Sequence, residues 1–112
     1  SDSFRKLASE LALQIAGVAP KYISYEDVPA EVVEAERNDI VENDASLARV
    51  PEDRREEVLN SKLKSRLAAQ VLMLQPWVKD ESTIIGDLLR KVIAETGENI
   101  IVRRFSRFKL GE

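Results

Sequence analysis

Hydrophobic residues recur every three or four positions along most of this chain, a spacing that predicts amphipathic helices. The first such run lies between Ser3, which can cap a helix, and Gly17, which can end one. Its apolar stripe consists of Phe4, Leu7, Leu11 and Ile15. We therefore expect the first helix to turn one face toward a hydrophobic core.

Two further helical patterns predict an antiparallel helical hairpin over residues 30–74. Pro29 suits the first position of a helix that we expect over residues 30–45, and Pro51 separates it from a helix that runs to about Leu74. The first of the two has a thin apolar stripe, formed by Val33, Ile40 and Leu47. The second is densest in apolar residues near its end, so we expect a hairpin with its base in the core and its tip in solvent.

Residues 99–110 form the only long stretch that is typical of a β-strand, because they are rich in Ile, Val and Phe. A fourth helix is expected before this strand, beginning at a cap on Asp80 or Ser82 and ending at Gly97. Helices of this kind need an apolar sheet face to cover. The sequence therefore predicts an α+β fold: about four main helices, packed on a small antiparallel sheet with one long C-terminal strand.

Short motifs connect these elements. Tyr22 and Ile23 offer a brief second strand, and Ser24 with Asp27 resembles the capping pair of a helix start. Trp77 is the only tryptophan of the chain. We expect it to pack over the base of the helical hairpin, and a role in stacking on a ligand would require a pocket beside it.

The composition indicates one domain of 112 residues, or a piece of a larger protein. The chain does not begin with Met, and we expect it to be processed or excised from something longer. No apolar run approaches the roughly 18 residues that suggest a membrane span. The net charge of −3 gives no general attraction to nucleic acid or to anionic membranes.

The sequence contains no Cys and no His. Their absence excludes thiol nucleophiles, disulfides and Cys/His zinc sites, and it removes the commonest general base. Carboxylates are present, but no isolated pair lies in an apolar setting that would perturb its pKa. We therefore expect no covalent catalysis, no cofactor and no metal.

Charge is distributed unevenly along the chain. Residues 26–57 contain twelve acids and four arginines, a local net charge of −8, which suits either a solvated helix face or a docking arm for a partner protein. Residues 100–112 have a net charge of +3. Their basic residues are Arg103, Arg104, Arg107 and Lys109. These charges either protect an edge strand or bind RNA, and the shortage of aromatic residues makes RNA the weaker interpretation.

Three blocks of the sequence resemble elongation factor Ts of bacteria and organelles. They are KYIS at 21–24 with EDVPAEVV at 26–33, LQPWVKD at 74–80, and GENI at 97–100 with RRF at 103–105, RF at 107–108 and GE at 111–112. The blocks follow the order of the family and extend over nearly the whole chain. Their combination makes the resemblance specific, although no single block would.

The resemblance implies a nucleotide-exchange factor that binds the translation GTPase elongation factor Tu and promotes release of its GDP. It also implies a location in the bacterial cytoplasm, or alternatively in a plastid or the mitochondrial matrix. Gln14 matches a family position on the first helix that faces the GTPase, so it is a candidate partner contact; an exposed glutamine without such a role is the alternative. Family members also carry an N-terminal helical domain and a Thr-Asp-Phe-Val motif that wedges into the GTPase. This sequence begins after both, so we expect it to exchange nucleotide poorly by itself.

The sequence leaves two other functions open. The chain could be an oligomerisation or scaffold module whose helical hairpin pairs with itself as a homodimer. Val33, Ile40 and Leu47 would then be buried between copies. It could also be a ribosome-associated RNA-binding module that uses the basic residues of its C-terminal strand.

Overall fold

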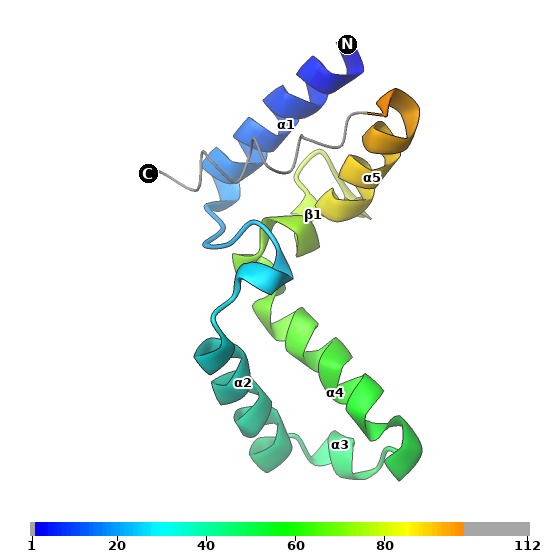
Figure 1. The fold of residues 1–112 in the computed structure, drawn as a ribbon. Helices are drawn as coiled ribbons and strands as arrows, with labels where there is room; N and C mark the ends of the chain where they lie inside the picture. The colour runs from blue at the N-terminus through cyan, green and yellow to red at the C-terminus, as the bar shows by residue number, and fades with distance from the viewer. Residues whose placement is uncertain (1, 98–112) are drawn as a thin grey trace.

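The computed structural model describes residues 2–97, which form a core and a helical hairpin that projects from it (Figure 1). Two helices frame the core, α1 (Asp2–Val18) and α5 (Ile85–Thr96). Strands β1 (Pro76–Trp77) and β2 (Asp80–Ile84) pair beside them as a two-stranded antiparallel sheet. The predicted α+β class, mostly helical with a small antiparallel sheet, is confirmed.

The core of this body lies between α1 and α5. Its buried members are Leu7, Leu11, Ile23, Leu72, Ile85, Leu89 and Val92. Phe4 and Ile15 pack against this cluster and are partly buried. The predicted apolar stripe of the first helix therefore faces the core. Complete burial of one such leucine contributes about 1.5–3 kcal/mol.

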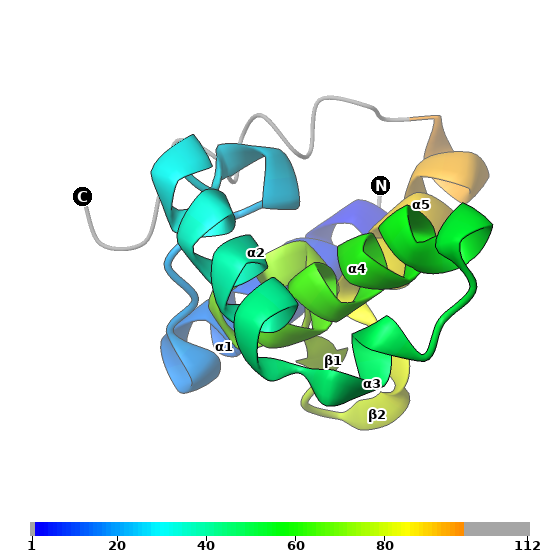
Figure 2. The same cartoon turned by 90° about the horizontal axis from the view of Figure 1, so that it is seen from below.

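The helical hairpin consists of α2 (Ala30–Asn43) and α4 (Glu52–Leu67), which are joined at the tip by the short helix α3 (Ala45–Ala48). Seen from below, the hairpin points toward the viewer in front of the core (Figure 2). It has an apolar core of its own, formed by Ile40, Leu47, Leu59 and Leu63. A third cluster, Val28, Leu67 and Val71, lies at the base of the hairpin.

The third helix is shorter than predicted, because α4 ends at Leu67 and not near Leu74. Two 3-10 turns follow it, η2 (Ala68–Gln70) and η3 (Leu72–Leu74). Apolar residues continue at helical spacing through this stretch, so the pattern alone does not show where the helix ends.

Pairing with a distant segment ends this helix. Tyr22 and Val71 form an isolated parallel bridge. The N–H of Leu72 donates to the carbonyl of Tyr22 at 2.9 Å, and the N–H of Met73 donates to that of Ile23 at 3.0 Å. These tertiary hydrogen bonds satisfy backbone groups that a longer helix would have paired internally. The brief strand predicted at Tyr22 and Ile23 is present only as this bridge.

The predicted start of the fourth helix is wrong, because residues 80–84 form strand β2. The Asp80 carboxylate accepts hydrogen bonds from the Ser82 N–H at 3.1 Å and from its hydroxyl at 2.6 Å, as a helix cap would. Here those bonds stabilise the start of a strand. The β-branched residues Thr83 and Ile84 favour extended backbone, and α5 begins only at Ile85.

The two predicted glycine stops behave differently. Gly97 follows α5 in the left-handed conformation, with φ of 72°, as predicted. By contrast, α1 continues past Gly17 to Val18, and Ala19 takes the left-handed conformation with φ of 51°. Because Ala19 precedes Pro20, helical backbone angles are disfavoured at this residue.

The capping pair is present but begins a different element. The backbone N–H and the hydroxyl of Ser24 lie 3.1 and 3.0 Å from Asp27 Oδ2, and this pair caps the 3-10 turn η1 (Tyr25–Asp27). Pro29 is the residue that precedes α2 and not its first helical residue.

Some predictions lie outside the described residues. They concern the long strand over residues 99–110 and the basic residues Arg103, Arg104, Arg107 and Lys109. Within residues 2–97, no helix combines the length and the apolar character that crossing a membrane requires.

Candidate partner-binding surface

Gln14 lies on α1, and its side chain is completely buried. Its Nε2 donates to Gln75 Oε1 at 3.2 Å and to the carbonyl of Pro76 at 3.0 Å. Its Oε1 accepts the N–H of Val78 at 2.9 Å. The alternative interpretation, an exposed glutamine, is wrong in this structure, because β1 and the turn after it cover Gln14. A role of Gln14 in partner contact stays a prediction.

Gln75 extends the same network toward the hairpin. It is also buried, with 2 % of its surface exposed, and its Nε2 donates to the carbonyl of Ala69 at 2.8 Å. The N–H of Ile85 donates to the backbone carbonyl of Gln75 at 2.9 Å. Two buried carboxamides thus connect α1, the turn after α4, and β1.

The turn between the strands is held against α1 from two sides. Trp77 pairs with Asp80, so Val78 and Lys79 form the two-residue connection. Gln14 binds the backbone of Val78, as described above, and the Lys79 ammonium forms an ion pair with Glu10.

An exposed apolar surface lies at this junction. Val78 is 51 % exposed and Leu13 is 57 % exposed. Leu13 is three residues after Glu10 on α1, so the two share a helix face, and Glu10 holds Lys79. We call Leu13, Val78 and Lys79 the α1–turn surface. The turn residues of this surface are positioned by the bond of Gln14 to Val78 and by the ion pair of Lys79 with Glu10, and Leu13 is the neighbour of Gln14 along α1.

Asp80 stabilises the end of the same turn. Hydrogen bonds from the Ser82 hydroxyl, and then from its N–H, hold the pKa of Asp80 below its ordinary value. The carboxylate is therefore ionised at neutral pH and continues to accept these bonds.

The residues proposed for self-association pack inside the helical hairpin of a single chain. Ile40 is fully buried and Leu47 is 5 % exposed, both against α4, and Val33 packs partly buried against the same cluster. Within one copy these three residues therefore pack inside the hairpin, and their burial between two copies stays a prediction. The stripe looked thin because its partners, Leu59 and Leu63, come from the other helix of the same hairpin.

Ion pairs connect the two long helices of the acidic arm. Arg37 on α2 pairs with Glu56 on α4 at 2.7 Å, and Arg66 on α4 pairs with Glu36 at 3.3 Å and with Asp39. The hydrogen bond from Arg66, and then one from Asn43, hold the pKa of Asp39 below its ordinary value. Because these pairs are largely exposed, each contributes little to stability by itself, but together they fix the register of α2 against α4.

Asp44 connects the tip of the hairpin to α4. Its carboxylate accepts the Ser46 N–H at 2.9 Å, which caps α3 and explains why α2 ends at Asn43 and not at 45. It also binds the Lys62 ammonium at 2.7 Å. The Lys62 hydrogen bond, followed by that of the Ser46 hydroxyl, lowers the pKa of Asp44 to about 2.

Trp77 does not pack over the hairpin base as predicted. It packs instead against the apolar cluster between α1 and α5. It also lines a groove there, which is the kind of pocket that a ligand-stacking role would have required.

The α1–turn surface was missed in the sequence because the strand pair was read as the start of a helix. One signal was available: Trp77 and the β-branched run Thr83–Ile85 flank a short polar segment, which is typical of a β-hairpin. In the described part of the chain, no group of three or more acidic side chains is placed to hold a metal ion. The surface offers contacts and no arrangement of reacting groups.

The described residues thus define a small α+β protein, a mostly helical core from which a helical hairpin projects. The family model for elongation factor TS matches residues 1–112, the whole of this sequence. The chain belongs to the elongation factor Ts family.

Curated relatives agree with this assignment. The chain is 45 % identical over 112 residues to elongation factor Ts of Coprothermobacter proteolyticus, an alignment that covers all of this chain and 56 % of the relative. It is 44 % identical over 110 residues to that of Methylacidiphilum infernorum, with 98 % and 53 % covered. It is 39 % identical over 114 residues to the chloroplastic elongation factor Ts of Cyanidioschyzon merolae, with 100 % and 54 % covered. The chain thus spans about half the length of these relatives.

Proposed function

We propose that this chain acts in translation elongation by binding the GTPase elongation factor Tu and contributing to the release of its GDP. The observation that carries the proposal is the family match over all 112 residues, together with relatives that are each named elongation factor Ts. The architecture supports it, because the described residues offer an apolar contact surface and a projecting hairpin.

The proposed mechanism is differential affinity and involves no covalent step. A factor that binds the nucleotide-free GTPase more tightly than its GDP form weakens GDP binding by the same factor. The chain needs no nucleophile, general base or metal for this activity. Its contribution is the free energy of its contacts with the GTPase.

We place one of those contacts on the α1–turn surface. Binding energy is concentrated in a few side chains that become fully desolvated. Leu13 and Val78 are exposed apolar side chains, the first next to Gln14 in the sequence and the second bonded to Gln14 through its backbone N–H. Gln14 contributes indirectly, because it holds the backbone of Val78 in place.

The compartment follows from the proposed activity. Elongation factor Tu works where polypeptides are made, so we place the chain in a bacterial cytoplasm, with a plastid or the mitochondrial matrix as the alternative. The chloroplastic relative supports the plastid alternative.

The test measures binding of the chain to elongation factor Tu loaded with a fluorescent GDP, together with the rate of GDP release. The main variant is Leu13→Asp, and its matched control is Val41→Asp on α2, because both side chains are 57 % exposed. We expect Leu13→Asp to weaken binding by about tenfold or more, as loss of a hot spot does, while Val41→Asp binds like the unchanged chain.

The outcomes separate three statements. No binding of the folded chain at micromolar concentration would contradict the proposed function. Loss of binding in Val41→Asp but not in Leu13→Asp would move the contact to the helical hairpin. Binding without faster GDP release would assign exchange to the part of the relatives that this chain does not span.

The two alternative functions have less support. Self-association through Val33, Ile40 and Leu47 competes with their burial inside one hairpin. RNA binding depends on basic residues that lie outside the described part of the chain.

A further inference from the structure

Three hydrogen bonds in series connect the turn between the strands to the end of α4. The N–H of Val78 donates to Gln14 Oε1 at 2.9 Å, and Gln14 Nε2 donates to Gln75 Oε1 at 3.2 Å. Gln75 Nε2 then donates to the carbonyl of Ala69 at 2.8 Å. We call these four amide groups, two from the backbone and two from side chains, the amide relay.

All three bonds of the amide relay point in the same direction. Each carboxamide accepts a hydrogen bond at its oxygen and donates one from its nitrogen, as successive peptide groups do along a helix. The two ends fix this direction, because the N–H of Val78 can only donate and the carbonyl of Ala69 can only accept. Hydrogen bonds in such a chain polarise one another, so the loss of one weakens the next. Both carboxamides are also buried, which keeps water from replacing a lost bond.

The Ala69 end of the amide relay lies at the base of the helical hairpin. Leu67, the last residue of α4, and Val71 are both buried in the cluster at that base. Between them, the carbonyl of Gln70 accepts the N–H of Tyr22 at 2.9 Å. Because Ala69 follows α4 so closely, the direction of its carbonyl depends on the angle at which α4 leaves the core.

We propose that the amide relay couples the direction of the helical hairpin to the position of the α1–turn surface. A change in the angle of α4 moves the carbonyl of Ala69, and the two carboxamides transmit this movement to the N–H of Val78. Coupling between two sites acts equally in both directions, so a partner that binds either the hairpin or the α1–turn surface biases the other. The proposal concerns the chain by itself and does not depend on the function proposed above.

The variant Gln14→Leu separates coupling from purely local bonding. Gln14 takes no part in the bond between Gln75 and Ala69. If each bond acted only where it is made, a change at Gln14 would leave the direction of the hairpin unaltered. Coupling predicts instead that the hairpin becomes less well fixed, although the substitution is on α1 and keeps the approximate volume of the side chain.

Pulsed EPR spectroscopy measures the direction of the hairpin in the full chain. The sequence has no Cys, so the exposed positions Arg49→Cys, beyond α3 at the hairpin tip, and Ala94→Cys on α5 carry the only two nitroxide labels. We expect a narrow distribution of distances between the labels, which becomes broader or shifts when Gln14→Leu is added. Gln75→Glu should have the same effect, because its carboxylate still accepts from Gln14 but cannot donate to the carbonyl of Ala69.

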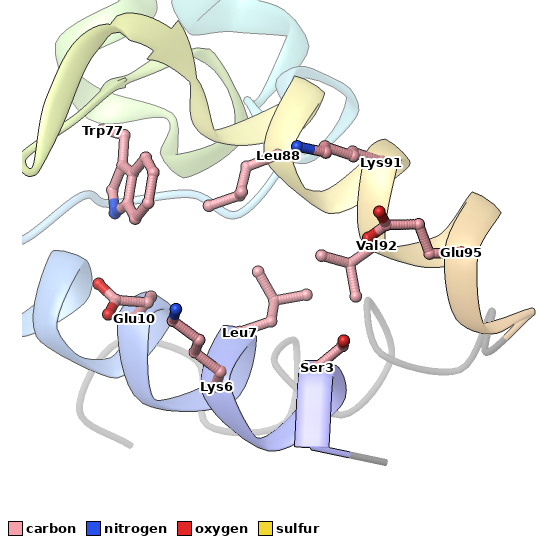
Figure 3. A pocket seen from close by; sticks show the side chains of 9 residues that line it. All are labelled: Ser3, Lys6, Leu7, Glu10, Trp77, Leu88, Lys91, Val92 and Glu95. Atoms are coloured by element: carbon pink, nitrogen blue, oxygen red, sulfur yellow. The ribbon is translucent and has the colours of Figure 1, made fainter.

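Leu7→Ala is the control for a general loss of stability. Leu7 points from α1 toward Val92 of α5 in the groove between these helices (Figure 3). It is 3 % exposed, so alanine at this position destabilises the core without removing a bond of the amide relay. We therefore expect the distance distribution of this variant to stay as narrow as that of the unchanged chain.

Hydrogen exchange of the Val78 N–H, measured by NMR, tests the opposite direction of coupling. In Gln75→Glu the bond from Val78 to Gln14 keeps both of its partners. We nevertheless expect this amide to exchange about two- to fivefold faster, up to the effect of losing one hydrogen bond, while amides in the middle of α1 keep their rates. A narrow, unshifted distribution in Gln14→Leu, an equally broad one in Leu7→Ala or in the unchanged chain, or unchanged exchange of Val78 would each overturn the proposal.

Discussion

The buried pair Gln14 and Gln75 allows a quantitative test of what positions the α1–turn surface. Replacing Gln14 by Leu keeps the approximate volume and removes three hydrogen bonds, to Gln75 Oε1, to the Pro76 carbonyl and from the Val78 N–H. Each bond contributes about 1 kcal/mol net, and the oxygen of Gln75 left unpaired in the interior costs a further 1–3 kcal/mol or so. Because leucine regains part of this by its greater hydrophobicity, we expect Gln14→Leu to lower the free energy of unfolding by about 2–4 kcal/mol.

The double variant identifies the contribution of the pair itself. Gln75→Leu loses the bond to Gln14 and the bond to the Ala69 carbonyl, so we expect a loss of about 1–3 kcal/mol. In Gln14→Leu with Gln75→Leu, the shared bond is lost only once and neither carboxamide is left unpaired. The combined loss should therefore be smaller than the sum of the single losses by about 1–2 kcal/mol.

Urea unfolding monitored by far-UV circular dichroism measures these free energies, and Trp77 fluorescence reports on the bonded segment. Gln14→Glu provides a control with a distinct pH dependence. Burial raises the folded-state pKa of the new carboxyl group above about 4.3. The variant should therefore be most stable at low pH and lose stability as the pH rises through that raised pKa. Additive single losses, or a Gln14→Leu chain as stable as the unchanged one, would refute this account of the network.

The remaining predictions concern single positions. Gly86→Ala should cost about 1–3 kcal/mol in urea unfolding, because the new Cβ would lie 2.8 Å from the Met73 carbonyl oxygen; Gly17→Ala, with open space around its Cβ, is the matched control and should be stabilising. Ala19→Gly should raise the melting temperature, because glycine adopts the left-handed φ of 51° without the roughly 1–2 kcal/mol penalty of other residues. Asp44 has a folded-state pKa of about 2, below its ordinary value, so its contribution to stability is complete above about pH 4 and is lost as the pH falls toward 2. Asp44→Asn should flatten that part of the plot of urea midpoint against pH. An unchanged plot would contradict this role of Asp44.

The helical hairpin shows what hydrophobic spacing can predict. Ile40 on α2 and Leu47 on α3 stand seven residues apart, and Leu59 and Leu63 on α4 stand four apart, so each side of the hairpin has an apolar stripe that the sequence shows. The spacing could not show that the two stripes bury each other, because contacts between segments are absent from a pattern along one segment. Spacing alone therefore leaves open whether the first stripe packs against the other helix or against a second copy.

The strand pair shows a different limit. The Asp80 and Ser82 pattern has the same local hydrogen bonds at a helix start and at a turn, so side-chain identity does not separate the two. Hydrogen bonds between separate segments decide the secondary structure after Asp80. They do so also at Val71, where pairing with Tyr22 ends the helical stretch. Local propensity is a weak guide wherever backbone groups find partners far along the chain.

The placement of Gln14 was, in contrast, readable from the spacing. It follows Leu11 by three residues and Leu7 by seven, so it belongs to the same helix face as the two buried leucines. A polar residue on a buried stripe must find partners inside the protein, and Gln75 with the backbone around Val78 supplies them. We therefore expect a substitution at Gln14 to weaken partner binding even if this side chain never contacts the partner. Binding data on Gln14 alone cannot separate a contact from a support, whereas Leu13→Asp, which leaves the buried network intact, can.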